Sequence, residues 1–148
     1  MFKKIKRKAA ALKKFNQDKV LTDILDNDIL KAQIVDLNQK QLYEQGLQAD
    51  GTPTGDYHPI TIAHKLKYGD ARGIPGRIDH ITGLDTGMTY DSMEVVAKED
   101  GIVVRADDHN DFFEIIDRGL GLTKESLSEI RPEIKSKIID EVKKAIRS

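Results

Sequence analysis

The chain has 148 residues, of which 39% are hydrophobic and 33% are charged, so we expect a single domain with a modest core. It holds four Phe, four Tyr and no Trp, which leaves aliphatic side chains to supply most of the buried surface. Because the chain has no Cys, disulfides, zinc–thiolate sites and thiol catalysis are excluded.

Residues 1–17 form a basic N-terminal segment. Its first 14 residues contain seven cations and no acid, namely Lys3, Lys4, Lys6, Arg7, Lys8, Lys13 and Lys14. The formal net charge of the chain is -1, so the remainder carries a net negative charge of about eight. The apolar run at residues 9–12 is too short for the core of a signal peptide, and we expect no membrane contact. The segment is a candidate contact to acidic protein or to DNA; a solvated amphipathic helix is the alternative.

Residues 18–48 predict a long helix, because apolar residues recur there at steps of three and four. Asn16 or Asp18 is the expected N-terminal cap, and Gly46 is the expected end. Three poor helix formers in succession, at residues 26–28, predict a break near Asn27.

Residues 49–83 predict a long connection, since three prolines and six glycines prevent any long regular element. One exception is residues 60–68, which can form two helical turns after Pro59. Connections of this length in a compact domain usually bind something, so we expect this one to contact a neighbouring subunit.

Residues 93–97 and 102–106 predict an antiparallel β-hairpin, with Asp100 and Gly101 supplying the turn. We expect residues 80–82 to add a third strand. An isolated hairpin is marginal in water, so it must pack on a helix or pair with a strand of another subunit.

The C-terminal part predicts two helices. A short one spans residues 111–118 and ends at Gly119, and a long one opens with Thr123 and Ser126 and runs from residue 124 to residue 147. Pro132 is expected to break or kink the long helix near Arg131. The expected fold class is therefore α+β, with N-terminal helices, a central antiparallel hairpin or small sheet, and a long C-terminal helix.

The triplet Asp85-Thr86-Gly87 is the short signature of retroviral-type aspartic proteases. Such an enzyme needs two Asp carboxylates in tight turns after apolar strands, so a single triplet requires a dimer. The preceding residues 81–84 match such a strand poorly. The competing interpretation is that Asp85 and Thr86 cap a short helix that starts near Gly87.

Other candidate chemistry is weaker. The acidic run at residues 107–111 is better explained as a turn and helix cap than as a metal site, because adjacent residues rarely converge on one ion. We assign no catalytic role to the scattered His58, His64, His80 and His109, and we expect neither a metal nor a cofactor.

Residues 81–146 resemble the tail-completion, or virion morphogenesis, proteins of tailed bacteriophages, a family of head–tail joining components. The resemblance lies in the order of five features. These are Leu84 with Thr86-Gly87-Met88, then Ser92, the two predicted strands, the helix that ends at Gly119, and Gly121-Leu122-Thr123 with Glu125 before the last helix. The first half, with residues 37–43 and 55–57, is similar to structural proteins of phages that infect Bacteroidetes.

The resemblance implies a structural virion protein that is not an enzyme and that acts at the head–tail junction, in the neck or tail completion. It implies a homo-oligomeric ring of about six or twelve copies, held by heterologous contacts between subunits. Portal or adaptor proteins and tail proteins are the implied neighbours, and assembly would take place in the host cytoplasm.

Two sets of residues are candidates for these contacts. The hairpin residues Met93, Val95, Ile102 and Val104 are the candidate ring interface, and the seven basic residues of the N-terminal segment are the candidate portal or packaged-DNA contact. The alternative functions are a dimeric aspartic protease that uses Asp85 and a small nucleic-acid-binding accessory protein.

Overall fold

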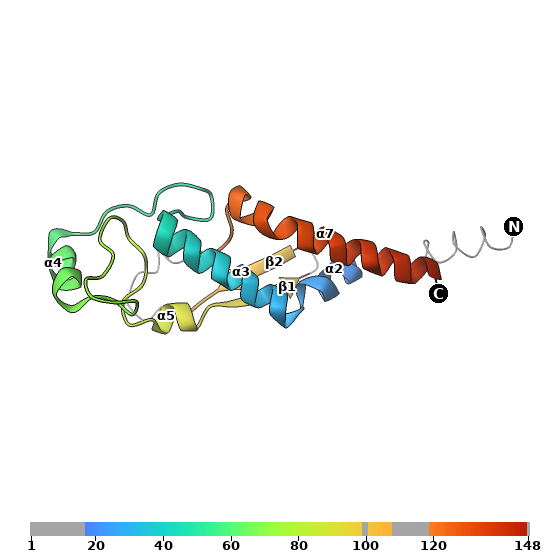
Figure 1. Cartoon of the computed structure of the whole chain (residues 1–148), viewed down its shortest axis with the longest axis horizontal. Helices are drawn as coiled ribbons and strands as arrows, with labels where there is room; N and C mark the ends of the chain where they lie inside the picture. The colour runs from blue at the N-terminus through green and yellow to red at the C-terminus, as the bar shows by residue number, and fades with distance from the viewer. Residues whose placement is uncertain (1–16, 99–100, 108–118, 148) are drawn as a thin grey trace, which may run out of the picture.

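The computed structural model describes residues 17–98, 101–107 and 119–147, which form an elongated α+β fold (Figure 1). The predicted fold class is confirmed. In chain order the elements are α2 (Gln17–Leu25), α3 (Asp28–Lys40), the π-helical turn η1 (Gln41–Gln45), α4 (Pro59–Tyr68), α5 (Met88–Asp91), β1 (Glu94–Lys98), β2 (Gly101–Arg105) and α7 (Lys124–Arg147). The predicted cap at Asn16 and the predicted helix at 111–118 lie outside the described residues.

The predicted N-terminal helix is divided at Asn27, as expected. The side chain of Asn27 accepts a hydrogen bond of 3.1 Å from the backbone N–H of Leu30, which caps α3. The helix then widens into η1 and ends at Gly46, whose φ of 63° places it in the left-handed region. The segment is therefore three consecutive pieces rather than one continuous helix.

The hairpin is antiparallel and pairs Val95 with Val104. Lys98 pairs with Gly101, so residues 99 and 100, which lie outside the described residues, are all that separates the strands. The prediction of a third strand at residues 80–82 is wrong, because the sheet of the described residues has two strands. The backbone N–H of Thr82 donates to the Tyr57 hydroxyl instead of to a neighbouring strand.

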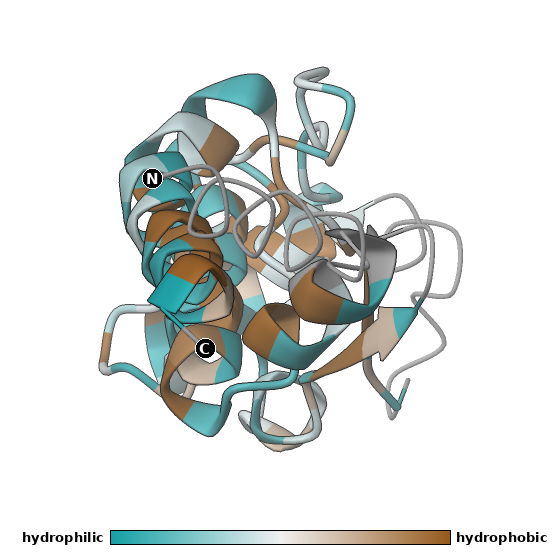
Figure 2. Ribbon diagram, turned by 90° about the vertical axis from the view of Figure 1, so that its right-hand side faces the viewer, coloured by the Kyte–Doolittle hydropathy of each residue, from teal (hydrophilic) through white to brown (hydrophobic). Residues whose placement is uncertain are grey.

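The main core lies where α2, α3 and α7 pack against the hairpin, and Figure 2 shows hydrophobic stretches of these elements side by side. Its buried members are Ile24, Leu25, Leu30, Ile34, Val95, Val104 and Ile130. Strand alternation explains the choice of face, since Val95 and Val104 are buried and Val103 is 41% exposed. A second, smaller cluster consists of Leu42, Leu84, Tyr90 and Met93.

Helix α7 runs without interruption through Pro132, so the predicted break is wrong. Thr123 opens it as expected, because its hydroxyl accepts a 3.2 Å hydrogen bond from the N–H of Ser126. Proline removes one helical hydrogen bond, to the carbonyl four residues earlier. That residue, Ser128, and Pro132 itself are both exposed, so the bond is missing on the solvent side of the helix.

Candidate interaction surface

Residues 47–91, which we call the connection lobe, form one end of the molecule, and the C-terminal end of α7 lies at the other end (Figure 1). The lobe contains the predicted helix after Pro59, now α4, and the short helix α5. Two interior features of the lobe hold its irregular backbone, and they determine which side chains face outward.

The first feature is a hydrogen-bond network around Thr82, which is fully buried. The Tyr57 hydroxyl lies 2.9 Å from Thr82 Oγ1 and also accepts from the Thr82 N–H at 2.9 Å. Thr82 Oγ1 accepts from the N–H of Leu84, and the hydroxyl of Tyr90 donates to the Thr82 carbonyl. The network therefore joins three separate segments of the lobe through hydrogen bonds, beside the apolar cluster that holds Leu84 and Tyr90.

The second feature is Lys65, a lysine that is only 4% exposed. Its Nζ donates to the carbonyl of Leu84 at 2.7 Å and lies 4.9 Å from the centre of the Tyr57 ring. A carbonyl and the face of an aromatic ring are both favourable neighbours for an ammonium group. Lys65 thereby fixes α4 to the segment that leads to Asp85.

His80 joins the lobe to the end of η1. Its Nε2 lies 3.1 Å from the carbonyl of Leu42 and 2.7 Å from that of Tyr43, so this nitrogen is the protonated donor. At Gly46 a Cβ would lie 2.5 Å from the His80 ring, and φ is positive, so glycine is required there for two reasons.

Three side chains around this junction have shifted pKa values. Burial raises the pKa of Tyr90, and burial followed by the nearby Asp70 raises the pKa of Tyr43. The hydrogen bond from Arg77 lowers the pKa of Asp79. The tyrosines therefore stay neutral at physiological pH and act as hydrogen-bond donors and acceptors.

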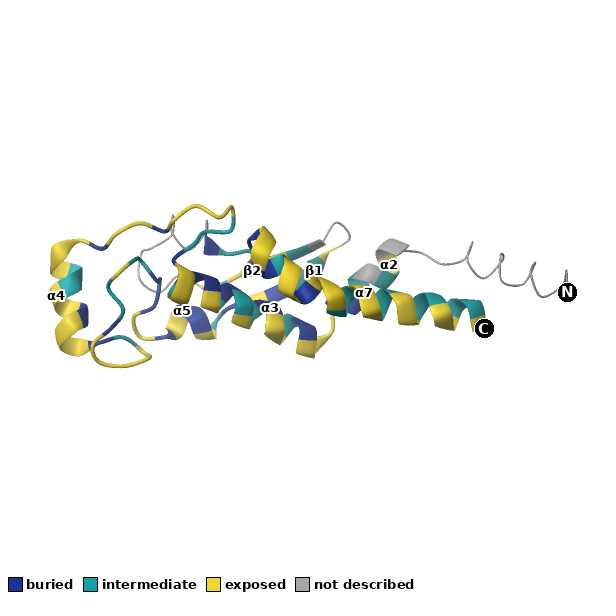
Figure 3. Ribbon diagram, turned by 45° about the horizontal axis from the view of Figure 1, so that its top comes forward, coloured by how far each residue is buried: buried dark blue, intermediate teal, exposed yellow. Residues whose placement is uncertain are grey.

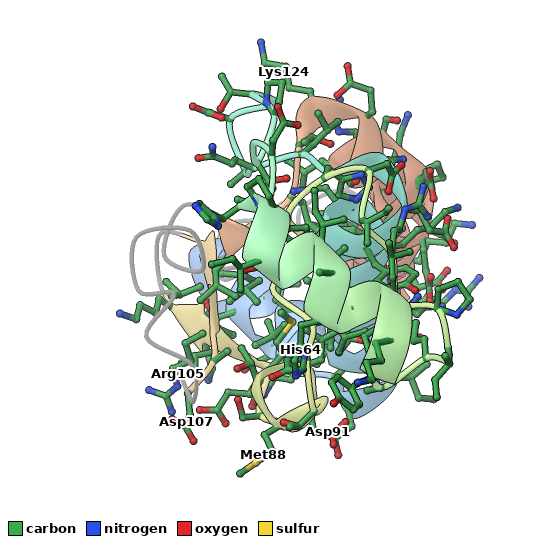
Figure 4. All side chains as sticks on the ribbon, turned by 90° about the vertical axis from the view of Figure 1, so that its left-hand side faces the viewer. His64, Met88, Asp91, Arg105, Asp107 and Lys124 are labelled. Atoms are coloured by element: carbon green, nitrogen blue, oxygen red, sulfur yellow. The ribbon has the colours of Figure 1, made fainter. Side chains whose placement is uncertain are left out.

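Large apolar side chains gather on the outside of the connection lobe. Of the eight that are exposed in the described residues, five belong to the lobe, namely Ile60, Leu66, Tyr68, Ile74 and Met88. Figure 3 shows that most of α4 is exposed, and Figure 4 shows Met88 extending away from the protein at the edge of α5. The connection lobe therefore carries most of the large apolar side chains that are exposed in the described residues.

One face of α4 is the most prominent part of this surface. Ile60, His64 and Tyr68 follow each other at four-residue steps and form a ridge, with Ile60 74% exposed and the His64 and Tyr68 ring centres 4.9 Å apart. Beside the ridge lies a hollow of about 250 Å³, lined by Tyr57, Ile60, Thr61, His64, Lys65, Leu84 and Asp85. The hollow is largely apolar, and Asp85 supplies an exposed carboxylate.

A second buried polar network joins the start of α7 to the end of α3 and the first residue of η1. The side chain of Asn38 donates to the carbonyl of Gly119 at 2.8 Å and accepts from the N–H of Gly121 at 2.8 Å. Gln41 Oε1 accepts from the N–H of Thr123 at 2.9 Å and from the Ser126 hydroxyl at 3.1 Å. We call these contacts the amide clamp.

Sequence reasoning missed the amide clamp and the Thr82 network. Asn38 and Gln41 fall within the helix predicted over residues 18–48, and both are fully buried although they are polar. The available signal was weak, because Gly119-Leu120-Gly121 offers backbone groups without side-chain cover but does not show which amides bind them.

The hairpin side chains predicted as the ring interface pack against this chain's own clusters. Met93, Val95 and Val104 are buried in this chain's own clusters, and Ile102 is half-buried against the main core. These side chains are therefore used within the subunit. The seven basic residues of the N-terminal segment lie outside the described residues.

Asp85 has surroundings that differ from those of a protease dyad. It is exposed, it follows an irregular segment and not a strand, and its carbonyl accepts from the N–H of Ala71 at 2.8 Å. The expected cap of α5 is partly correct: Thr86 Oγ1 accepts from the Met88 N–H at 3.4 Å, and the residue next to the helix is Gly87.

Within residues 17–98, 101–107 and 119–147, no group of three or more His, Asp or Glu side chains is placed to hold a metal ion. Over the same part of the chain, no helix combines the length and apolar character needed to cross a bilayer. Most of the acidic run at 107–111 lies outside these ranges.

Comparison with protein families, with curated proteins and with solved structures gives no match to this chain.

Proposed function

We propose that this chain is a structural subunit of the head–tail junction of a tailed phage, where copies assemble into a ring by repeated contacts. The observation that carries the proposal is the gathering of exposed apolar side chains on the connection lobe, at one end of an elongated molecule. Exposed apolar patches that have no role inside the subunit are typical of surfaces that a partner covers.

The shape of the molecule supports this function. A ring requires a heterologous contact, in which two different surfaces of the same subunit meet. An elongated subunit with a patch at one end and a helix at the other presents such a pair of surfaces without any change of fold.

The order of elements also agrees with the resemblance. Helix α5 follows Thr86-Gly87, the hairpin follows Ser92, and Gly121-Leu122-Thr123 leads into the terminal helix. The amide clamp gives the Gly-Leu-Thr segment a physical purpose, because it sets the position of α7 relative to α3.

In this proposal the chain makes or breaks no bond. Portal or adaptor proteins and tail proteins are its neighbours in the virion, and the host cytoplasm is where it assembles. The basic N-terminal segment contacts an acidic protein surface or packaged DNA through salt-sensitive attraction.

The test is mass spectrometry of purified particles, together with electron microscopy of the isolated chain. We expect the chain in stoichiometric amounts in the virion and ring-shaped particles in the isolated sample. A chain that is absent from purified virus, and monomeric at all concentrations, would contradict the proposal.

Two assays distinguish the alternative functions. Peptide cleavage that is lost in Asp85→Asn would favour the protease, and retention of DNA by the monomer at low salt would favour the nucleic-acid-binding protein.

A further inference from the structure

We propose that the distal part of α7 in one copy docks on the connection lobe of the next copy, against the ridge and hollow beside α4. The inference rests on the proposed function, and it adds which two surfaces of the subunit meet.

The stripe consists of Ile139, Val142 and Ile146, at spacings of three and four residues on one side of α7. Ile139 is 43% exposed, and Val142 and Ile146 are half-buried. None of the three belongs to either core cluster, in contrast to Ile130, Ile134 and Ile138 nearer the start of the helix. Among the described residues, this stripe therefore lies outside both core clusters.

The receiver is the α4 ridge with its hollow of about 250 Å³. Ile60 and Leu84 give the hollow apolar walls, and this volume is sufficient for one or two aliphatic side chains. Asp85 lies in its lining as an exposed carboxylate.

Charge favours this pairing over pairing of two α7 helices. Residues 135–147 contain five basic and two acidic residues, whereas the connection lobe contains six Asp and four Lys or Arg. Two distal α7 segments would repel each other, and the distal segment and the lobe attract. Lys135 and Lys143 lie one helical turn on either side of Ile139, which places cations near the exposed carboxylate of Asp85. The cation in the same lining, Lys65, is only 4% exposed and donates to the carbonyl of Leu84.

The two surfaces lie at opposite ends of the subunit, so the stripe on α7 does not contact the connection lobe of its own copy (Figure 1). The contact joins different surfaces, which makes it heterologous, and successive copies then close into a ring or continue as a filament.

The experiment uses the full chain and two single variants, Ile60→Asp in the receiver and Ile139→Asp in the stripe. Both positions are exposed, so the fold is kept, which circular dichroism checks. Each variant alone should self-associate at least roughly tenfold more weakly than the wild type. Light scattering after size-exclusion chromatography measures this self-association. An equimolar mixture should form a one-to-one dimer and stop there, because each variant keeps the surface that the other has lost.

The control is Ile29→Asp, which changes another exposed isoleucine, on α3, and should assemble like the wild type. If Ile139→Asp prevents assembly and Ile60→Asp does not, two α7 helices pair with each other and the inference is overturned. If the wild type assembles and both variants assemble equally well, only this contact is refuted and the proposed function stands. A wild type that is monomeric at every concentration overturns both.

Discussion

The helical end of this protein and the connection lobe are stabilised by different interactions. The hairpin and the helices α2, α3 and α7 share an apolar core, in which Leu30 and Ile34 are completely buried. The connection lobe is organised around the buried residues Thr82, Tyr57 and Lys65. The Tyr57 hydroxyl is hydrogen-bonded to Thr82, and Lys65 donates to the carbonyl of Leu84. The comparison shows that the lobe commits few of its apolar side chains to its interior, which leaves them available on its surface.

The difference has an energetic consequence. Apolar burial contributes about 25 cal/mol per Å², whereas a hydrogen bond contributes about 1 kcal/mol net because water competes for its partners. We therefore expect the lobe to open locally at a lower free energy than the helical part.

Leu30→Ala should cause the largest loss of stability. Leu30 is fully buried in the main core, and truncating such a residue costs about 2–5 kcal/mol through lost burial and a cavity. Urea unfolding followed by circular dichroism measures the loss in the free energy of unfolding. The matched control is Ile29→Ala at the neighbouring position, which is 69% exposed and should change the free energy of unfolding by under about 0.5 kcal/mol. Equal effects at the two positions would refute the assigned core.

Asn38→Leu tests the amide clamp that joins α3 to α7. Leucine has similar volume but leaves the carbonyl of Gly119 and the N–H of Gly121 without partners, at a cost of about 1–3 kcal/mol. Amide hydrogen exchange should accelerate at Gly121 and Thr123 before it changes in the hairpin.

The control for the clamp is Gln33→Leu, an exposed amide on the same helix. It should leave exchange at Gly121 unchanged. Slow exchange at Gly121 in Asn38→Leu would mean that the clamp does not hold the start of α7.

Apolar periodicity predicted the helical part well. Regular steps of three and four located α3 and α7, and alternation located the hairpin, because burial in these elements repeats with the period of the backbone. Pro132 misled the prediction, since a proline on the exposed side of a helix removes one hydrogen bond without ending the helix.

The connection lobe was predicted only in outline. Its helix after Pro59 could be expected, but the roles of Thr82 and Lys65 could not, because each depends on partners far along the chain. The burial of the hairpin side chains could not be predicted for a related reason: alternation shows that Val95 and Val104 share a face but not that the same chain covers it.

Tyr57→Phe should weaken the lobe alone. It removes the hydroxyl that bonds both Thr82 Oγ1 and the Thr82 N–H, which are buried, and we expect a loss of about 1–2 kcal/mol. Hydrogen exchange of the lobe amides should accelerate while that of α3 is unchanged.

The matched control is Tyr68→Phe, which removes a hydroxyl from a ring that is 59% exposed. Exchange in the lobe should match the wild type. If Tyr57→Phe instead destabilised the lobe and the helical part equally, the two regions would unfold as one unit and the comparison between them would fail.

Alkaline pH should expose the smallest of these effects, through Tyr90. Burial raises the pKa of this phenol above its ordinary value of 10.0, so the folded state holds the proton more tightly than the unfolded chain does. The stabilisation is complete below pH 10 and decreases as the pH rises beyond it, because only the unfolded chain then loses the proton. We expect the free energy of unfolding, measured with urea, to be roughly 1 kcal/mol lower at pH 11 than at pH 9.

Tyr90→Phe should be less stable than the wild type at pH 9, since it lacks the hydrogen bond to Thr82, but should lose less stability between the two pH values. Tyr68→Phe should keep the wild-type pH dependence, and an unchanged dependence in Tyr90→Phe would show that the buried phenol of the lobe is not its source.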